Sequence, residues 1–199
     1  QGPSFDNGDI VREALRHDIP RPMQAFVFNT QREVFKDRLV RQALNYALDF
    51  EWMNKNLFYG LYSRTHSYFQ NTEYMAAGNP SEAELAILEP FRDQLPAEIF
   101  GDVYHPNVTD GGGNIRGELR QALGILKKAG WELQDQKMVN QETGQPLEFE
   151  LMLYNPAFER IALPVQRNLE RIGVTMNIRM VDITQATKRL RSRDFDLIA

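Results

Sequence analysis

The stretch from Phe28 to Asp49, F-N-T-Q-R-E-V-F-K-D-R-L-V-R-Q-A-L-N-Y-A-L-D, decides the fold prediction for this chain. An apolar strand is expected at its start, over residues 23–29, and a polar turn follows. Asp37 is suited to cap a helix, because its carboxylate can accept hydrogen bonds from the free N–H groups of the first turn. Apolar residues then recur at helical spacing and form one stripe: Leu39, Val40, Ala43, Leu44, Ala47 and Leu48. The pattern predicts a strand, a turn and an amphipathic helix over residues 37–49.

Composition sets the class of the chain. With 199 residues, 42% hydrophobic and 25% charged, it has the balance of a globular domain. A net charge of −4 argues against nucleic acid as its partner. No apolar run approaches the length of a membrane span. The absence of cysteine excludes disulfides and thiolate metal sites, and is compatible with a bacterial periplasmic protein.

The middle of the chain predicts helices separated by long irregular stretches. Ser81 and Glu84 have the spacing of a capping box, which predicts a helix from there to Leu88 or Leu95. Residues 61–80 and 96–114 lack periodicity and are predicted to be loop or irregular structure. The remaining elements expected before residue 140 are short helices over 9–17 and 50–58, a helix over 116–129 that ends at Gly130, and a hairpin over 131–139.

The last third predicts a parallel sheet. Leu147, Phe149, Leu151 and Leu153 alternate with other residues as in a strand. A helix over 157–172, interrupted by Pro164, and a strand over 174–181 complete a βαβ unit, whose strands should be parallel. A helix over 184–192 and a strand over 195–198 would repeat it. We therefore expect an α/β fold with a mixed sheet, βαβ units and flanking helices.

Several short motifs carry a resemblance to a known family. The Phe28–Asp49 run is the longest of them. The others are Leu126-Lys127-Lys128-Ala129-Gly130-Trp131, Tyr154-Asn155, Leu169 with Ile172-Gly173-Val174, and Asp194-Phe195-Asp196. Together they resemble the extracellular solute-binding proteins of family 5, the peptide- and nickel-binding receptors of bacterial ABC importers. The stretch 57–65 is most similar to the subgroup that takes up microcin C and oligopeptides. The chain departs from the family pattern at Glu33-Val34 and over 61–115.

The resemblance implies an architecture and a mode of action. Residues 23–199 would form the C-terminal lobe of a type II periplasmic-binding-protein-like fold, and residues 1–22 a linker or crossing segment from the other lobe. The chain would be a fragment, cut within a strand at its C-terminal end. The whole protein would be a periplasmic monomer without a cofactor. It would capture oligopeptides or peptide-like compounds in a cleft between lobes and deliver them to an ABC permease in the inner membrane.

Candidate ligand contacts come from two sources. In open α/β sheets, ligands bind beyond the carboxyl ends of strands, which favours Phe28-Asn29, Tyr154-Asn155 and Asp182. The resemblance implies ligand contacts that carry over approximately to Phe28, Asn155 and Phe158. A second group combines aromatic rings with one cation, as suits a peptide; its chosen members are Arg64, His66 and Tyr68. The alternative for that group is a packed loop that covers a sheet edge.

Other chemistry finds less support in the sequence. His17, His66 and His105 lack the spacing of metal ligands, so no metal site is predicted. No nucleophile–base pair is recognisable, so no catalytic residue is predicted, although a hydrolytic α/β domain is kept as the alternative function and a structural interaction module as a third. Gly111-Gly112-Gly113 favours a flexible loop over an anion nest. Glu148 and Glu150 are interpreted as a solvated strand face.

Overall fold

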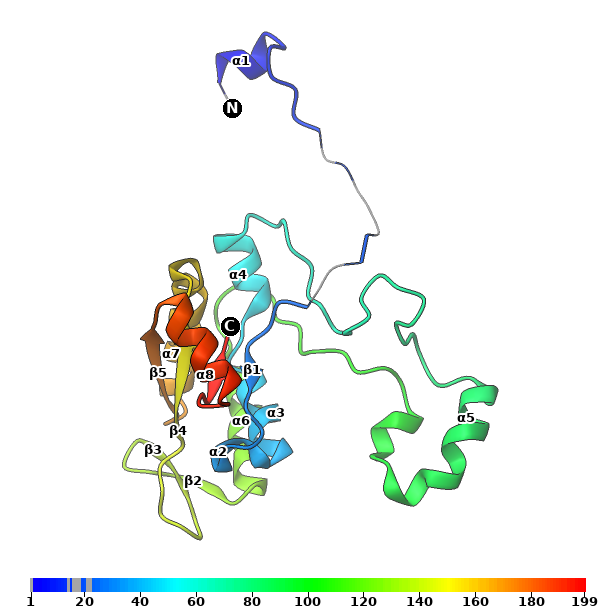
Figure 1. Cartoon of the computed structure of the whole chain (residues 1–199), viewed down its shortest axis with the longest axis vertical. Helices are drawn as coiled ribbons and strands as arrows, with labels where there is room; N and C mark the ends of the chain where they lie inside the picture. The colour runs from blue at the N-terminus through cyan, green and yellow to red at the C-terminus, as the bar shows by residue number, and fades with distance from the viewer. Residues whose placement is uncertain (1, 14, 16–18, 21–22) are drawn as a thin grey trace. The chain divides into compact units, whose positions relative to one another are not determined.

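The computed structural model describes residues 2–13, 15, 19–20 and 23–199 of the chain (Figure 1). It divides into two compact units. The first, which we call the sheet unit, comprises residues 24–64 and 105–199. The second comprises residues 65–104 together with the described residues up to Met23. The predicted division into residues 1–22 and 23–199 stays a prediction about the longer protein.

A mixed four-stranded sheet organises the sheet unit. Its strand order is β1 (Val27–Phe28), β6 (Leu197–Ile198), β4 (Glu148–Leu153) and β5 (Thr175–Met180). β4 is parallel to both β5 and β6, while β1 runs antiparallel to β6. The predicted parallel pairing within the βαβ unit is therefore confirmed. β1 is shorter than predicted and sits at one edge of the sheet, paired through Val27 with Ile198 and through Phe28 with Leu197.

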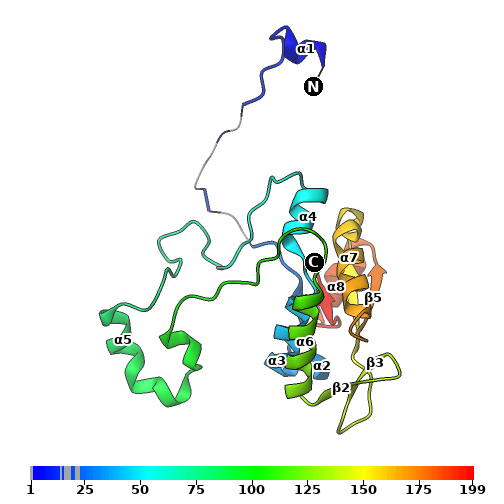
Figure 2. The same cartoon turned by 180° about the vertical axis from the view of Figure 1, so that it is seen from behind.

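Helices cover both faces of the sheet (Figures 1 and 2). The helix α7 (Glu159–Glu170) packs on β5 and contributes to the main core, together with α3 (Arg38–Asn45) and α6 (Arg116–Lys128). The helix α8 (Ile183–Arg191) lies on the opposite face, over a smaller apolar cluster. β4 alternates accordingly: its main-core side chains are Phe149, Leu151 and Leu153, whereas Met152 belongs to the small cluster.

Two aspartates cap helices in the sheet unit: Asp37, as predicted, and Asp49, which was not predicted as a cap. Asp37 follows the short helix α2 (Glu33–Lys36) and accepts from the backbone N–H of Leu39 at 2.8 Å, which starts α3. α3 ends at Asn45, four residues earlier than predicted. Asp49 caps α4 (Phe50–Leu57) by accepting from Trp52 N at 3.1 Å.

A two-stranded hairpin completes the sheet unit. It consists of β2 (Trp131–Gln134) and β3 (Lys137–Asn140), joined by a tight turn at Asp135 and Gln136, where both residues have positive φ. The turn is of the type that matches strand twist in hairpins. Met138 N donates to Gly173 O at 2.7 Å, which ties the hairpin to the end of α7.

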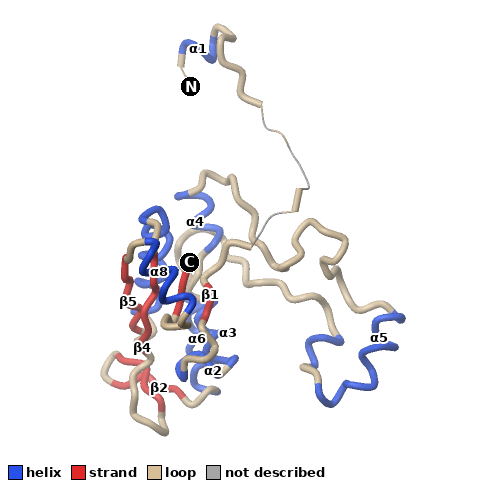
Figure 3. Tube along the Cα trace, in the orientation of Figure 1, coloured by secondary structure: helices blue, strands red, loops and turns tan. Residues whose placement is uncertain are grey.

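The second unit consists of short helices. They are α1 (Pro3–Asp6), α5 (Glu82–Leu88) and two 3₁₀ segments, η1 (Glu89–Gln94) and η2 (Ala97–Phe100). Ser81 and Glu84 form the predicted capping box of α5. Residues 61–80 contain neither helix nor strand, as predicted, and appear as continuous loop in Figure 3.

One local expectation proves wrong. The predicted helix over residues 9–17 is absent from its described part, residues 9–13 and 15, while 14, 16 and 17 lie outside the described residues.

The loop before α6, whose glycines predicted a flexible segment, makes hydrogen bonds to residues far earlier in the chain. Thr109 N donates to Glu51 Oε2 at 3.0 Å, and the Thr109 hydroxyl donates to Asp49 Oδ1 at 2.5 Å. Long-range partners, which local glycine content does not reveal, fix this loop on α4.

Candidate functional site

The carboxyl end of β4 displays polar and aromatic side chains. Tyr154 follows the strand with its side chain exposed. Asn155 caps the 3₁₀ turn η3 (Pro156–Phe158), because its Oδ1 accepts from Ala157 N at 3.0 Å. Phe158 is half-buried against the main core. Phe158 therefore packs the turn against the core, while Tyr154 and Asn155 are exposed to solvent.

An arginine side chain lies near an aromatic ring close to the carboxyl end of β4. The guanidinium carbon of Arg160, in the first turn of α7, lies 5.4 Å from the centroid of the Phe58 ring, which follows α4. Tyr62 meets the same Phe58 ring edge to face, with centroids 4.7 Å apart. Both views of the chain place the end of α4 beside the start of α7 (Figures 1 and 2). We call Phe58, Tyr62, Tyr154, Asn155 and Arg160 the carboxyl-edge group.

Asn54 holds the loop that carries Tyr62. Its Nδ2 donates to Tyr62 O at 2.7 Å, and its Oδ1 accepts from Tyr62 N at 3.1 Å. The side chain thus bonds both backbone groups of one residue, as a neighbouring strand would. Gly60 N adds a third bond by donating to Asn54 O at 2.8 Å. These bonds fix the backbone at Tyr62, while the ring itself contacts Phe58.

Arg160 retains its capacity to bind an anion. Within the described parts of the chain, its side chain makes the stacking contact with Phe58 but no hydrogen bond or ion pair. A guanidinium presents five N–H donors in a planar fork that matches a carboxylate. Arg160 is exposed, so these donors are open to an anion from solvent.

The predicted residue Asn29 lies at the other end of the sheet. Because β1 is antiparallel to β6, its carboxyl end lies toward the amino ends of β4 and β6, away from Tyr154. The Asn29 amide is also occupied within the chain. Its Nδ2 donates to the carbonyls of Arg193 and Phe195, at 3.0 and 2.8 Å, and its Oδ1 accepts from Gln31 N. Asn29 and Asn155 are therefore not brought together.

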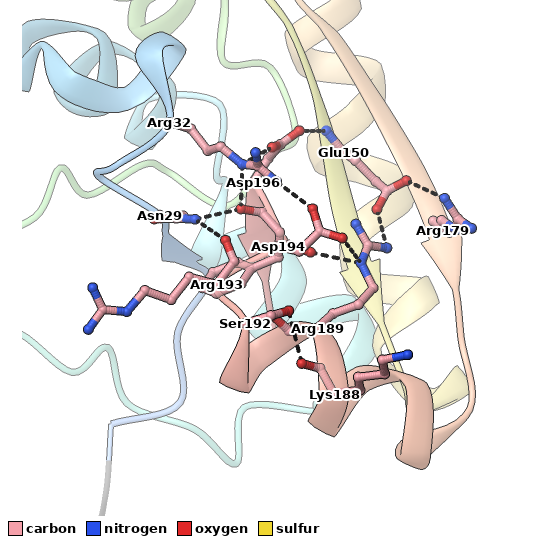
Figure 4. A network of polar contacts seen from close by, with 11 residues as sticks. Asn29, Arg32, Glu150, Arg179, Lys188, Arg189, Ser192, Arg193, Asp194 and Asp196 are labelled. Carbon is pink, nitrogen blue, oxygen red and sulfur yellow. Dashed lines mark hydrogen bonds and ion pairs between the residues drawn. The ribbon is translucent and has the colours of Figure 1, made fainter.

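Asn29 belongs to a polar network around the entry to β6 (Figure 4). Arg32 forms ion pairs with Asp194 at 2.9 Å and with Asp196 at 3.0 Å. Asp196 in turn accepts from the backbone N–H of Glu150 at 3.0 Å. These bonds join the segment after β1 to β4 and β6, so this edge of the sheet is closed by polar contacts.

Glu150 is the centre of the same network, and its interpretation as part of a solvated strand face is wrong. Its carboxylate pairs with Arg189 of α8 at 2.7 Å and with Arg179 of β5 at 3.3 Å (Figure 4). Arg189 also donates to Asp194 O at 2.8 Å. Alternation predicts which face of β4 carries Glu150, but α8 covers that face and brings its own cation.

The remaining predicted contacts are distributed over both units. Phe28 packs on the main core, with its ring 4.9 Å from that of Phe35. Arg64 belongs to the sheet unit, where its guanidinium carbon lies 5.5 Å from the Phe50 ring centroid. His66 and exposed Tyr68 belong to the second unit. The predicted group of Arg64, His66 and Tyr68 is therefore divided between two units, and its binding role stays a prediction.

Sequence reasoning missed Arg160, Phe58 and Asn54. Arg160 lies five residues after the Tyr-Asn motif, but nothing in its neighbours signals a stacking partner a hundred residues earlier in the chain. Asn54 lies mid-helix, where an asparagine is a weak helix former. This low helix propensity is the one feature of the sequence that points to the bonds between the Asn54 side chain and the following loop.

Among the residues that the structure describes, no helix is long and apolar enough to cross a membrane. Over the same residues, no three His, Asp or Glu side chains gather in a way that could hold a metal ion.

Comparisons with known proteins define the class of the chain. Residues 6–199 match the family model of bacterial extracellular solute-binding proteins, family 5 middle. The chain therefore belongs to this family. The predicted family and fold class are confirmed.

Particular relatives agree with this assignment. The chain is 47% identical over 197 residues to YejA, an uncharacterized protein of Escherichia coli strain K12, covering 99% of the chain and 33% of the relative. It is 43% identical over 198 residues to a probable peptide-binding protein YejA of Agrobacterium fabrum, covering 98% and 32%. The chain thus spans about a third of the length of these curated relatives.

A solved structure shows the same fold. The oligopeptide-binding protein AppA of Bacillus subtilis, solved in complex with a nonapeptide, superposes with a TM-score of 0.62 over 87% of this chain and 29% of its own. The sequence identity of 22% limits this likeness to the fold.

Proposed function

We propose that the chain is part of the ligand-binding component of an ABC importer and that it contributes the carboxyl-edge group to a peptide-binding cleft. The complete protein would act as a monomer in the periplasm, enclose a peptide between this lobe and another, and deliver it to a permease. Membership of family 5 and the name of the Agrobacterium fabrum relative support the peptide assignment.

One observation carries the proposal. The guanidinium carbon of Arg160 lies 5.4 Å from the centroid of the Phe58 ring, and its N–H donors have no partner among the residues that the structure describes. An exposed arginine ordinarily samples many rotamers, and ordering its side chain costs conformational entropy. The contact with Phe58 limits the rotamers of Arg160 in advance, which lowers the entropy cost of a bidentate pair with a ligand carboxylate. Tyr154 and Tyr62 expose 40% and 59% of their surface, so both rings offer aromatic area to a ligand.

The group has the chemistry of recognition. Aromatic rings supply contact area at low conformational cost, the Asn155 amide can donate to a peptide carbonyl, and Arg160 can bind the terminal carboxylate. Ring, amide and guanidinium groups hold a ligand but do not by themselves attack one. Binding therefore explains these residues better than the alternative of a hydrolytic domain.

The test is calorimetry on the complete protein with a mixture of tri- to hexapeptides. Arg160→Ala should weaken binding about 10- to 100-fold, since a hydrogen bond to a charged group contributes about 1.5–3 kcal/mol. Arg160→Lys should recover part of the affinity. Arg167→Ala is the matched control, because Arg167 is exposed on the same helix. Equal losses for both alanine variants, or none for Arg160→Ala, would contradict the proposal.

A second measurement tests the shared cleft. The 199-residue chain alone should bind the same peptides at least 100-fold more weakly than the complete protein, because one wall of the cleft is missing. Peptides amidated at the C-terminus should lose affinity for the complete protein, as Arg160 would lack its carboxylate. Equal and tight binding by chain and complete protein would place the whole site within this lobe.

A further inference from the structure

Residues 65–104 are rich in apolar side chains that they do not bury. The segment contains six aromatic residues: Tyr68, Phe69, Tyr74, Phe91, Phe100 and Tyr104. None of its 40 residues is buried in the structure, and Tyr68 and Ile87 expose 84% and 71% of their surface. Soluble proteins rarely leave so many large apolar side chains gathered in one exposed segment. The segment lacks the core that its composition would support.

Local interactions nevertheless order the segment. The capping box of Ser81 and Glu84 starts α5, and Arg92 forms a two-pronged pair with Glu89, at 2.7 Å for each bond. The Arg92 guanidinium carbon also lies 3.9 Å from the Phe100 ring centroid. Segments that stay disordered have few aromatic residues and low hydrophobicity. This one has the composition and the caps of a segment that packs against something.

We propose that residues 65–104 form a docking surface for the part of the complete protein that lies outside this chain. The relatives are about three times as long as the chain, and a remainder of that length in this protein would supply the covering surface. This docking does not depend on which ligand the protein carries.

Charge indicates the chemistry of the covering surface. Residues 65–104 contain seven Asp or Glu residues and one Arg, giving a formal charge of −6, whereas the whole chain carries −4. A complementary surface would be apolar with a basic rim, since like charges across an interface are unfavourable. Salt should weaken the docking, because the Debye length is about 8 Å at physiological ionic strength and shortens as salt is added, which screens attraction between exposed charges.

Hydrogen exchange read out by mass spectrometry tests the proposal. Peptides within residues 65–104 should exchange at least 100-fold more slowly in the complete protein than in the 199-residue chain, while peptides of β4 should be protected in both. Rapid exchange of 65–104 in both proteins would overturn the proposal. Slow exchange of residues 65–104 in the 199-residue chain by itself would also overturn it. Protection that does not depend on protein concentration would place the covering surface within this chain, and protection that rises with concentration would identify it as a second copy of the chain.

A variant pair sharpens the same test. Ile87→Asp should lower the melting temperature of the complete protein, because it places a charge in the docked surface, and should leave the melting of the 199-residue chain unchanged. Val40→Asp should lower both, since Val40 is buried in the core of the sheet unit. An Ile87→Asp variant with unchanged melting in the complete protein would contradict the docking, whatever the outcome for the ligand site.

Discussion

The helices α7 and α5 are both well formed at their starts, yet they differ in what they bury. α7 follows a capped 3₁₀ turn and buries Ala162, Val165 and Leu169 against the sheet. α5 has a complete capping box and buries no residue. Capping and propensity therefore suffice to place a helix in both regions. Only the packed face of α7 removes apolar surface from water, which is the dominant favourable contribution to stability.

The largest effect is expected from a substitution in the main core of the sheet unit. Leu151 is fully buried in β4, and Leu151→Asp would place a carboxylate in the main core without a partner. We expect a loss of about 4 kcal/mol or more, enough to unfold the sheet unit. Circular dichroism during urea titration measures it. Ile87→Asp in the same 199-residue chain should leave the transition in place; a cooperative, wild-type-like transition for Leu151→Asp would contradict the assigned core.

A glycine pair separates tertiary contact from helix propensity. Gly173 has φ +77°, and a Cβ there would lie 2.5 Å from Leu133 Cδ1 and 2.8 Å from Met138 N. Gly173→Ala should destabilise the sheet unit by about 2–4 kcal/mol, because both backbone strain and overlap with the hairpin result. Urea unfolding measures the change.

The control for that change is Gly124→Ala. Gly124 lies inside α6, and nothing lies within 4 Å of a Cβ built there. The substitution should stabilise the chain by up to about 1 kcal/mol, since alanine favours a helix. Similar changes of the same sign in both variants would mean that the hairpin does not pack on Gly173 as described.

An ion-pair comparison has a smaller expected effect. Arg189 and Glu150 expose 16% and 23% of their side chains, so their pair is partly desolvated. Arg189→Ala should cost about 1–3 kcal/mol, because Glu150 would lose its shorter ion-pair contact. Arg92→Ala removes the exposed pair with Glu89 and should leave urea unfolding unchanged. Equal effects of the two substitutions would show that the network near β6 is no better shielded from water than the surface pair.

The smallest expected effect concerns pH and α5. Hydrogen bonding of Glu84 to the Ser81 backbone N–H lowers the pKa of the Glu84 carboxyl, with a further contribution from the Ser81 hydroxyl. A carboxyl with a lowered folded pKa stabilises the helix above its unfolded pKa, and this contribution is lost as pH falls through the folded pKa. Carbon chemical shifts of residues 82–88 should therefore move toward coil values in acid. Glu84→Gln should remove this response; a response unchanged by Glu84→Gln would exclude the capping box as its cause.

Much of the fold could be predicted from the sequence, because its signals are local. Asp37 caps α3, Ser81 and Glu84 start α5, and the alternation of Phe149, Leu151 and Leu153 identifies the strand that becomes β4. These signals depend on neighbours within a few residues. The same is true of the motifs that resemble family 5, which the family match over residues 6–199 confirms.

The candidate site could be predicted only in part. The Tyr154-Asn155 motif correctly marks the carboxyl end of a strand, but the direction of β1 could not be inferred, since pairing between strands far apart in sequence leaves no local pattern. Because β1 pairs antiparallel with β6, Asn29 lies at the opposite end of the sheet from Tyr154. Its amide nitrogen there donates to two backbone carbonyls. The stacking of Arg160 on Phe58 likewise joins residues about a hundred positions apart.

The sequence by itself determined the main helices and strands of the sheet unit, which of their faces are apolar and which family the chain resembles. Tertiary structure decided which polar residues are occupied and which remain open to a ligand. Glu150 and Arg160 illustrate the difference. Both are charged residues of the same βαβ unit, one in β4 and the other in α7, yet Glu150 pairs with two arginines and Arg160 contacts an aromatic ring. A side chain's partners depend on what the fold places within a few ångströms of it, and sequence distance does not measure that.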